Sequence, residues 1–115
     1  MGVTVATVRR LALALPDVVE LPHHEMTSFR VAGKIFVTVP PTDDRAHVFV
    51  GAADVASYCA EFPGAAEELY WGKRLSGCRV LLRRAGQPML REVLTAAWCA
   101  KAPKKLLAEF EAAQA

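Results

Sequence analysis

The chain has 115 residues, of which 53% are hydrophobic and 23% charged, and its formal net charge is +2. A chain of this length can bury one hydrophobic core, and its composition differs from that of disordered proteins, so we expect one domain over residues 1–115. No window approaches the roughly 20 apolar residues of a membrane span. Arginines also interrupt the apolar N-terminal stretch where a secretion signal would be unbroken. We therefore expect a cytoplasmic protein without a membrane partner.

The first element predicted is a helix over residues 4–15. Apolar residues recur in this segment at helical spacing, Thr4 is a suitable N-cap, and Pro16 is a suitable end. The stretch that follows, around Pro22, has no clear period and is predicted to be irregular.

Three strands are predicted next. Residues 28–32 alternate with period two, as a strand does, and residues 35–39 continue beyond Gly33-Lys34, which predicts a β-hairpin. A cluster of prolines and aspartates then forms a turn before a third strand over residues 46–50. These three strands are expected to form an antiparallel meander.

A short helix and a second hairpin are predicted after the meander. The helix carries apolar residues on one face from Val55 to Phe62. Strands are expected over residues 69–75 and 78–84, with a tight turn at Ser76-Gly77.

The C-terminal part of the chain is predicted to be helical. One helix opens at Pro88, and a second segment begins at Pro103 and continues through Phe110. Strands that are grouped in meanders, with helices between the groups, indicate an α+β fold: two layers, with helices on one face of an antiparallel sheet.

Residues that often serve in catalysis or metal binding show no motif. His23-His24-Glu25 lacks a third ligand at metalloprotease spacing, and we interpret it as a polar loop or an edge segment. His47 is interpreted as a sheet side chain. The cysteines at positions 59, 78 and 99 lack paired C-x-x-C spacing and are predicted to be small buried hydrophobes. We therefore expect no cofactor, no metal and no enzymatic activity, with an unknown enzyme as a minor alternative.

The charges are distributed unevenly along the chain. Residues 1–68 carry five Lys or Arg against nine Asp or Glu, a net charge of −4, whereas residues 69–105 carry nine against one, a net charge of +8. The cations of this second segment are Lys73, Arg74, Arg79, Arg83, Arg84, Arg91, Lys101, Lys104 and Lys105. Concentrated positive charge favours phosphate binding, and a solvated surface is the alternative interpretation.

Three aromatic residues near the cations have two possible roles. An exposed aromatic ring beside basic residues can stack on a base, whereas a buried ring anchors a core. Trp98 lies on the apolar face of its predicted helix and is expected in the core. Strand alternation predicts that only one of Tyr70 and Trp71 faces solvent.

Several segments together resemble a known family. They are Leu13-Ala-Leu-Pro16, Ser28 to Phe36, and Ala97-Trp98 followed by Ala102-Pro103-Lys104-Lys105-Leu106. This combination resembles the MmcQ/YjbR family of small bacterial proteins, over about residues 8–110. The resemblance implies an α-β(3)-α-β(2)-α order and a DNA-binding role, without a defined reaction or cofactor.

The sequence thus yields one leading hypothesis and one alternative. The leading hypothesis is a DNA-binding protein whose contacts are mainly to phosphates, made by a basic hairpin and the C-terminal helices. Its predicted contact residues are Lys73, Arg74, Arg79, Arg83, Lys104 and Lys105. The alternative is a non-enzymatic module that binds a protein partner or forms a homodimer through a sheet face or edge.

Overall fold

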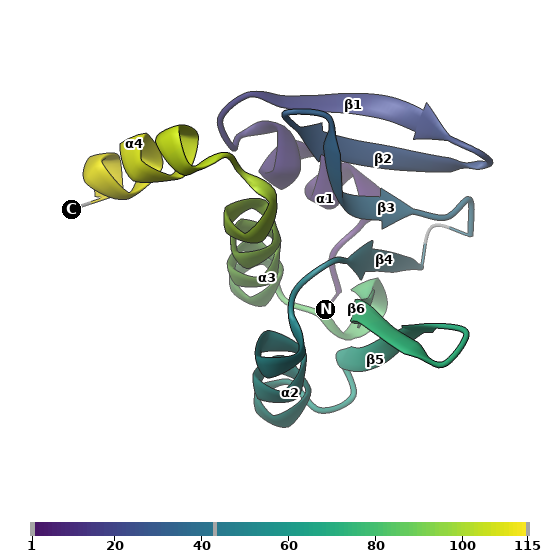
Figure 1. Ribbon diagram of the computed structural model, residues 1–115. Coiled ribbons are helices and arrows are strands. Elements are labelled where there is room, and N and C mark those ends of the chain that lie inside the picture. Colours follow the sequence, from purple (N-terminus) through teal and green to yellow (C-terminus); the bar gives the residue numbers. More distant parts are fainter. Residues whose placement is uncertain (1, 43, 115) are drawn as a thin grey trace.

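The structure is a computed structural model, and it describes residues 2–42 and 44–114. The elements in chain order are α1 (Val5–Leu13), β1 (Val18–His23), β2 (Met26–Val31), β3 (Lys34–Val39), β4 (Arg45–Val48), α2 (Ala52–Glu61), β5 (Ala66–Trp71), β6 (Arg74–Leu81), the 3₁₀ helix η1 (Leu82–Arg84), α3 (Gln87–Lys101) and α4 (Lys104–Gln114) (Figure 1). The six strands form one antiparallel sheet in the order β1-β2-β3-β4-β6-β5. The predicted α+β class with an antiparallel sheet is confirmed.

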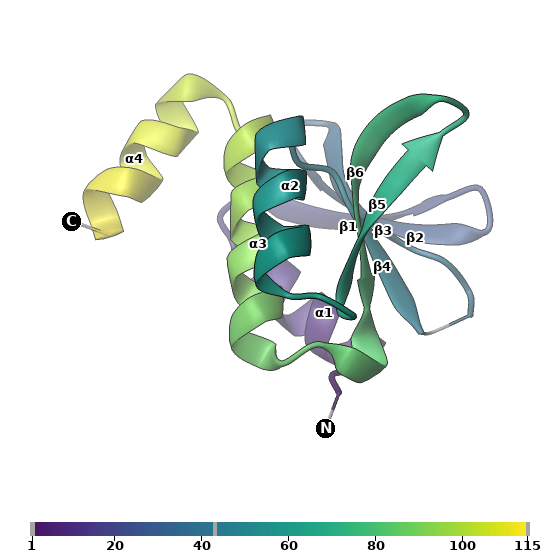
Figure 2. The ribbon, with the colours of Figure 1, turned by 90° about the horizontal axis from the view of Figure 1, so that it is seen from below.

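The helices α1, α2 and α3 cover one face of the sheet, and the opposite face carries no helix of the described residues (Figure 2). Strand register aligns apolar side chains on the covered face, for example Phe29 with Val37, Val48 and Cys78 across four strands. All four side chains are fully buried. The two-layer arrangement is the one that the grouping of strands predicted, and it leaves one sheet face open.

Trp98 connects three helices at one end of the core. The residue lies on α3 and is fully buried. Its Nε1–H donates to the carbonyl oxygen of Pro16, just after α1, at 3.0 Å. The centroid of its ring lies 4.8 Å from the ring centroid of Phe110 on α4. The predicted core position of Trp98 is confirmed. At the other end of α1, Thr4 is the N-cap of a capping box with Thr7, as its position predicted.

The prediction of an irregular stretch around Pro22 was wrong, because β1 occupies it. Four strands therefore precede α2 instead of three. β1 pairs only with β2 and forms one edge of the sheet. A proline lacks the N–H that a central strand needs on both sides, but an edge strand tolerates it, so Pro22 does not interrupt this strand.

The predicted turn at Ser76-Gly77 was also wrong. The chain turns at Gly72 and Lys73, where Gly72 has a φ of 61°, and both Ser76 and Gly77 lie inside β6. Gly77 is needed for another reason. A Cβ at this position would collide with the carbonyl oxygen of Val48 on β4, so glycine permits the close approach of the two strands.

Replacing Gly77 by alanine tests this explanation. We expect Gly77→Ala to lower the free energy of unfolding by about 1–3 kcal/mol, since the backbone of β4 must move to admit the methyl group. The measurement is urea denaturation. Gly51→Ala is the matched control, because a Cβ there meets nothing within 4 Å and φ is −73°. Equal stability of the two variants would contradict the close-approach explanation.

Candidate functional site

A row of polar side chains crosses the open face of the sheet. Antiparallel register places Ser28, Thr38, His47, Arg79 and Glu67 next to one another on β2, β3, β4, β6 and β5. Directly paired residues in an antiparallel sheet point to the same face, so these five side chains share one face. The apolar rows occupy the other face, under the helices.

Some side-chain atoms of this polar row have hydrogen-bond partners, and two do not. Ser28 donates its hydroxyl proton to the carbonyl of Leu21 at 2.7 Å, and an Arg79 guanidinium nitrogen lies 3.5 Å from a carboxylate oxygen of Glu67. By contrast, Thr38 Oγ1 and Arg79 Nε are buried and have no hydrogen-bond partner among the described residues. Buried polar atoms are usually paired, so these two atoms mark unused hydrogen-bonding capacity.

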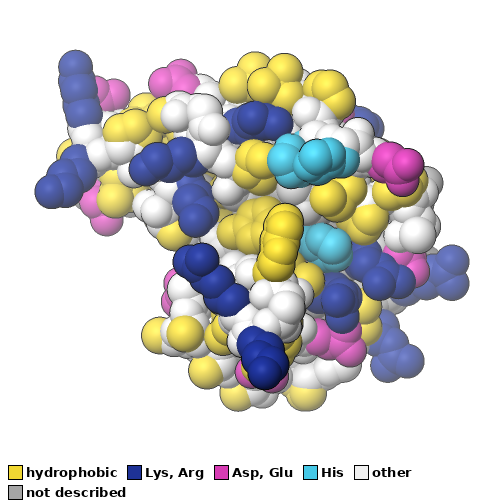
Figure 3. Space-filling view, turned by 45° about the vertical axis from the view of Figure 1, so that its right-hand side comes forward, with side chains coloured by type: hydrophobic (Ala, Val, Ile, Leu, Met, Phe, Trp, Pro, Cys, Tyr) yellow, Lys and Arg dark blue, Asp and Glu magenta, His cyan; other side chains and the backbone are white. Residues whose placement is uncertain are grey.

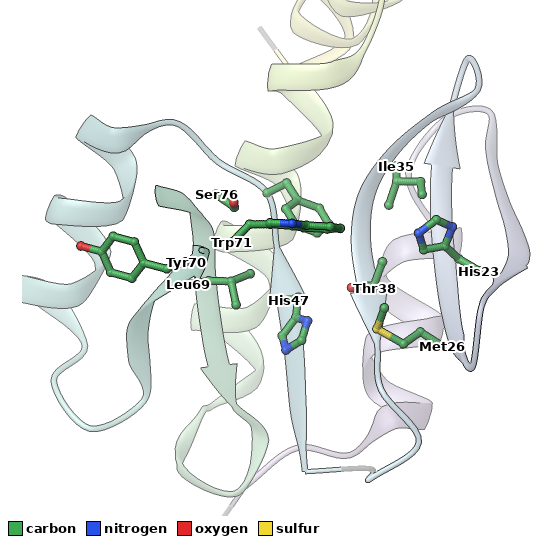
Figure 4. A pocket seen from close by; sticks show the side chains of 10 residues that line it. His23, Met26, Ile35, Thr38, His47, Leu69, Tyr70, Trp71 and Ser76 are labelled. Carbon is green, nitrogen blue, oxygen red and sulfur yellow. The ribbon is translucent and has the colours of Figure 1, made fainter. Parts of the chain in front are cut away.

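A groove of about 350 Å³ lies on the open face above this row, and we call it the sheet groove. The residues that line it are His23, Met26, Ile35, Thr38, His47, Phe49, Leu69, Tyr70, Trp71 and Ser76. In the close-up, the Trp71 ring lies beside His47, with Ile35 and Met26 across the groove, while the Tyr70 ring points away (Figure 4). The groove therefore has mainly apolar walls and a few polar atoms at Thr38 and His47.

Trp71 and Tyr70 are both exposed, although alternation predicted that only one would be. The exposed fractions are 79% for Trp71 and 51% for Tyr70. The register of β5 with β6 shifts between Leu69 and Tyr70, so strict alternation is interrupted just before the turn. A tryptophan is largely buried in most folded domains, so the exposed Trp71 ring is a candidate contact for a binding partner.

A second hollow, of about 550 Å³, adjoins the sheet groove at Trp71, and we call it the basic hollow. It lies between the β5–β6 turn and the end of α3, and Arg74 and Lys101 line it. Trp71, Phe49 and Ser76 line both hollows. In the space-filling view, an exposed hydrophobic side chain stands out on this side of the molecule, with histidines beside it and Lys and Arg side chains around it (Figure 3).

Of the six cations predicted to bind DNA, only three lie in the second hairpin. Lys73 and Arg74 occupy its turn and the start of β6, beside Trp71, and Arg79 lies in the middle of β6. Arg83 was predicted on the same strand, but it belongs to η1. The strand from Arg74 to Leu81 is roughly 23 Å long at about 3.3 Å per residue, and Arg83 lies beyond its far end, so the four cations do not form one patch.

The other two predicted contact residues, Lys104 and Lys105, begin α4. Both are exposed. Lys105 lines a separate hollow together with Asp17 and Glu109, whose carboxyl groups offset its charge. The helix α4 extends away from the β5–β6 hairpin (Figures 1 and 2). The structure therefore does not bring these lysines to the hollows at Trp71.

His47 lies in the polar row, as its interpretation as a sheet side chain predicted. Burial lowers the pKa of its imidazole below the usual value of 6.5, and the positive charges of Arg79 and Arg45 lower it further. The side chain is therefore neutral at pH 7 and can both donate and accept a hydrogen bond.

This lowered pKa predicts a pH dependence of stability. Between the pKa of folded His47 and 6.5, the unfolded chain binds more protons, so the free energy of unfolding falls as the pH drops through this window. We expect His47→Gln to remove this part of the pH dependence in urea denaturation at pH 7 and pH 5. His24→Gln, at the exposed β1–β2 turn, is the control. An imidazole pKa of 6.5 or above for His47 by NMR would contradict the prediction.

The remaining reactive residue types are the histidines, the acidic residues and the three free cysteines. Within residues 2–42 and 44–114, no three His, Cys, Asp or Glu side chains are grouped so that they could hold a metal ion. Burial raises the pKa of Cys78 to about 12 and also raises the pKa values of Cys59 and Cys99. A raised pKa keeps these thiols protonated. The predicted burial is confirmed for Cys78, whereas Cys59 and Cys99 are only partly buried. No described helix is long and apolar enough to span a membrane.

Two residues of the site, Lys101 and Thr38, were not predicted as specific candidates. Lys101 was counted only in the charge total, although its position in the last turn of α3 directs it to the basic hollow. Thr38 gave no signal, because a threonine in a strand is ordinary. Only the pairing of β3 with β4 places it beside His47.

Comparison with solved structures identifies the fold. The crystal structure of Deinococcus radiodurans protein DR2400, described as a DUF419 domain, matches with a TM-score of 0.73, covering 96% of this chain and 89% of that chain at 18% sequence identity. At this identity the similarity shows a common fold and nothing further. No family model matches the sequence, and no curated protein matches it.

Proposed function

We propose that this chain is a DNA-binding protein of the MmcQ/YjbR type that contacts DNA with the open side of its sheet around Trp71. One observation carries the proposal: a tryptophan that is 79% exposed stands between the apolar sheet groove and the basic hollow. The fold shared with the DUF419 domain of DR2400 supports membership of that group, as do the sequence segments that resemble it.

The two hollows suit the two chemical parts of a nucleic acid. Arg74 and Lys101 in the basic hollow offer charge to phosphates, and neutralising phosphates releases condensed counterions. The Trp71 ring offers a stacking surface for a base, and stacking on aromatic side chains is how single strands are commonly held. Bases in a duplex already stack on one another, so the site favours DNA with unpaired bases.

A binding role without catalysis is part of this proposal. A cysteine nucleophile requires a lowered thiol pKa, whereas burial raises the pKa values of all three cysteines here. The role requires a location where DNA is accessible, which for a bacterial protein is the cytoplasm.

A second candidate function is self-association or the binding of a protein partner through β1. The strand forms an edge of the sheet, and two of its apolar side chains, Val19 and Leu21, are 51% and 43% exposed. Exposed edges with apolar side chains are typical sites of strand pairing. Light scattering at high protein concentration tests the self-association form, since a mass equal to the monomer would eliminate it.

The experiment that tests DNA binding is fluorescence anisotropy with a labelled single strand of DNA and with the corresponding duplex, in a series of salt concentrations. We expect the single strand to bind more tightly and its affinity to fall steeply with salt, because phosphate contacts release counterions. The absence of binding to either DNA at low salt would refute the proposal and favour a protein partner.

A further inference from the structure

The sheet groove contains hydrogen-bonding capacity that the described residues of the chain do not use. Thr38 is only 3% exposed, it lines the groove, and its Oγ1 has no partner among the described residues. Its neighbour in the polar row, His47, is uncharged at pH 7 and adds a donor and an acceptor beside it. Because native proteins seldom leave such a hydroxyl unpaired, the groove fits an occupant that brings polar atoms to Thr38 and His47.

The residues that line the groove determine which molecules fit into it. Trp71 provides a flat and exposed ring on one side, and Ile35 and Met26 provide apolar contacts across from it (Figure 4). The volume of about 350 Å³ is near the lower end of small-molecule sites, which begin at about 300 Å³. A molecule that fits is small and planar, with apolar faces and a polar edge. A purely apolar occupant would leave the Thr38 hydroxyl unpaired.

The basic hollow places positive charge next to the groove, which favours a ligand with an anionic group. Arg74 and Lys101 line it, and Trp71 borders both hollows, so an anionic group attached to a ring in the groove would lie near the two cations. We infer that the sheet groove binds one unpaired nucleobase, which stacks on Trp71 and forms hydrogen bonds at its edge with Thr38 and His47. This inference rests on the proposed function and specifies which part of the DNA enters the groove.

Two oligomers of equal charge separate base binding from phosphate binding. The probes are ten-residue oligothymidylate and an abasic oligomer with the same number of phosphates, and free thymidine monophosphate is the third probe. We expect the abasic oligomer to bind at least about tenfold more weakly than oligothymidylate, since it offers no base to stack. Anisotropy of labelled oligomers measures both affinities.

Tryptophan fluorescence reports whether the base reaches the groove. The chain has two tryptophans, and Trp98 is fully buried, so a ligand that stacks in the groove quenches Trp71 selectively. We expect quenching by oligothymidylate and none by the abasic oligomer. Trp71→Phe keeps an aromatic ring and leaves only the Trp98 signal, so the quenching should disappear in this variant.

Thr38→Val tests the hydrogen bond at the floor of the groove. The side chains have the same shape, so this variant should fold with equal or greater stability, because it removes a buried unpaired hydroxyl. We expect it to lose about three- to tenfold in affinity for oligothymidylate. Thr27→Val, the same change on β2 at a residue that does not line the groove, is the control and should bind as the unmodified chain does.

The outcomes distinguish failure of this inference from failure of the proposed function. Equal affinity for the two oligomers, with no effect of Thr38→Val, would overturn base binding in the groove while leaving phosphate binding intact. If neither oligomer binds but thymidine monophosphate quenches Trp71, the groove takes a free nucleotide and the DNA proposal fails. If none of the three probes binds or quenches, both proposals are refuted.

Discussion

Trp98→Ala is expected to lower the free energy of unfolding by about 3–5 kcal/mol, the range for removing a large aromatic side chain from a core. The indole is fully buried, and its Nε1–H donates to the Pro16 carbonyl at 3.0 Å. Truncation leaves a cavity between α3 and α4, removes the contact with the Phe110 ring, and leaves the carbonyl without that donor. Urea denaturation followed by circular dichroism measures the loss.

Trp71→Ala is the matched control for this prediction, because it removes the same side chain from the surface. Trp71 is 79% exposed, and surface substitutions of this kind usually change stability by no more than about 0.5 kcal/mol. We therefore expect one tryptophan to be essential for the fold and the other to be dispensable for it. Equal losses from the two substitutions would show that Trp71 is part of the packing, and would remove the main support for a binding role.

The second large effect is expected on DNA binding. Replacing both Arg74 and Lys101 by glutamate reverses the charge of the basic hollow. We expect at least a tenfold loss of affinity for single-stranded DNA at low salt. The slope of log affinity against log salt should become less steep by about 1.4, since each lost phosphate contact accounts for about 0.7 in a single strand.

A control of equal charge accompanies this double variant. Arg83→Glu with Lys104→Glu changes the net charge by the same amount, but at η1 and at the start of α4, away from Trp71. We expect this control to retain most of the affinity. If both double variants lose affinity equally, the overall charge determines binding and the basic hollow has no special role. Thermal denaturation of both variants verifies that they are folded.

Much of the fold could be predicted because its signals are local. Helical spacing of apolar residues and proline at helix starts predicted α1, α3 and α4, and the position of Trp98 followed from the same period. β1 was missed because Pro22 disfavours a central strand, and the sequence alone does not tell that this strand is at an edge. Ser76-Gly77 resembled the sequence of a turn. Gly77 is instead required because its backbone lies close to β4, a strand that is distant in sequence.

The site was less predictable because it depends on the arrangement of strands in space. The positive segment is continuous in sequence, yet β6 separates Arg74 from Arg83, and α3 separates the hairpin from Lys104. Tyr70 and Trp71 are both exposed because a register shift interrupts the alternation that a regular strand would impose. The neighbouring positions of Thr38 and His47 follow from the pairing of β3 with β4, which no local pattern encodes.

The most direct test of the account is to locate the bound DNA by NMR. Amide chemical-shift changes in the ¹⁵N-labelled protein are followed as ten-residue oligothymidylate is added, together with the indole N–H signals of the two tryptophans. We predict changes concentrated at the β5–β6 turn, the end of α3 and the polar row around Thr38 and His47, with a shift of the Trp71 indole signal and little change at Trp98. Changes confined to β1, or to η1 and the start of α4, would contradict the account.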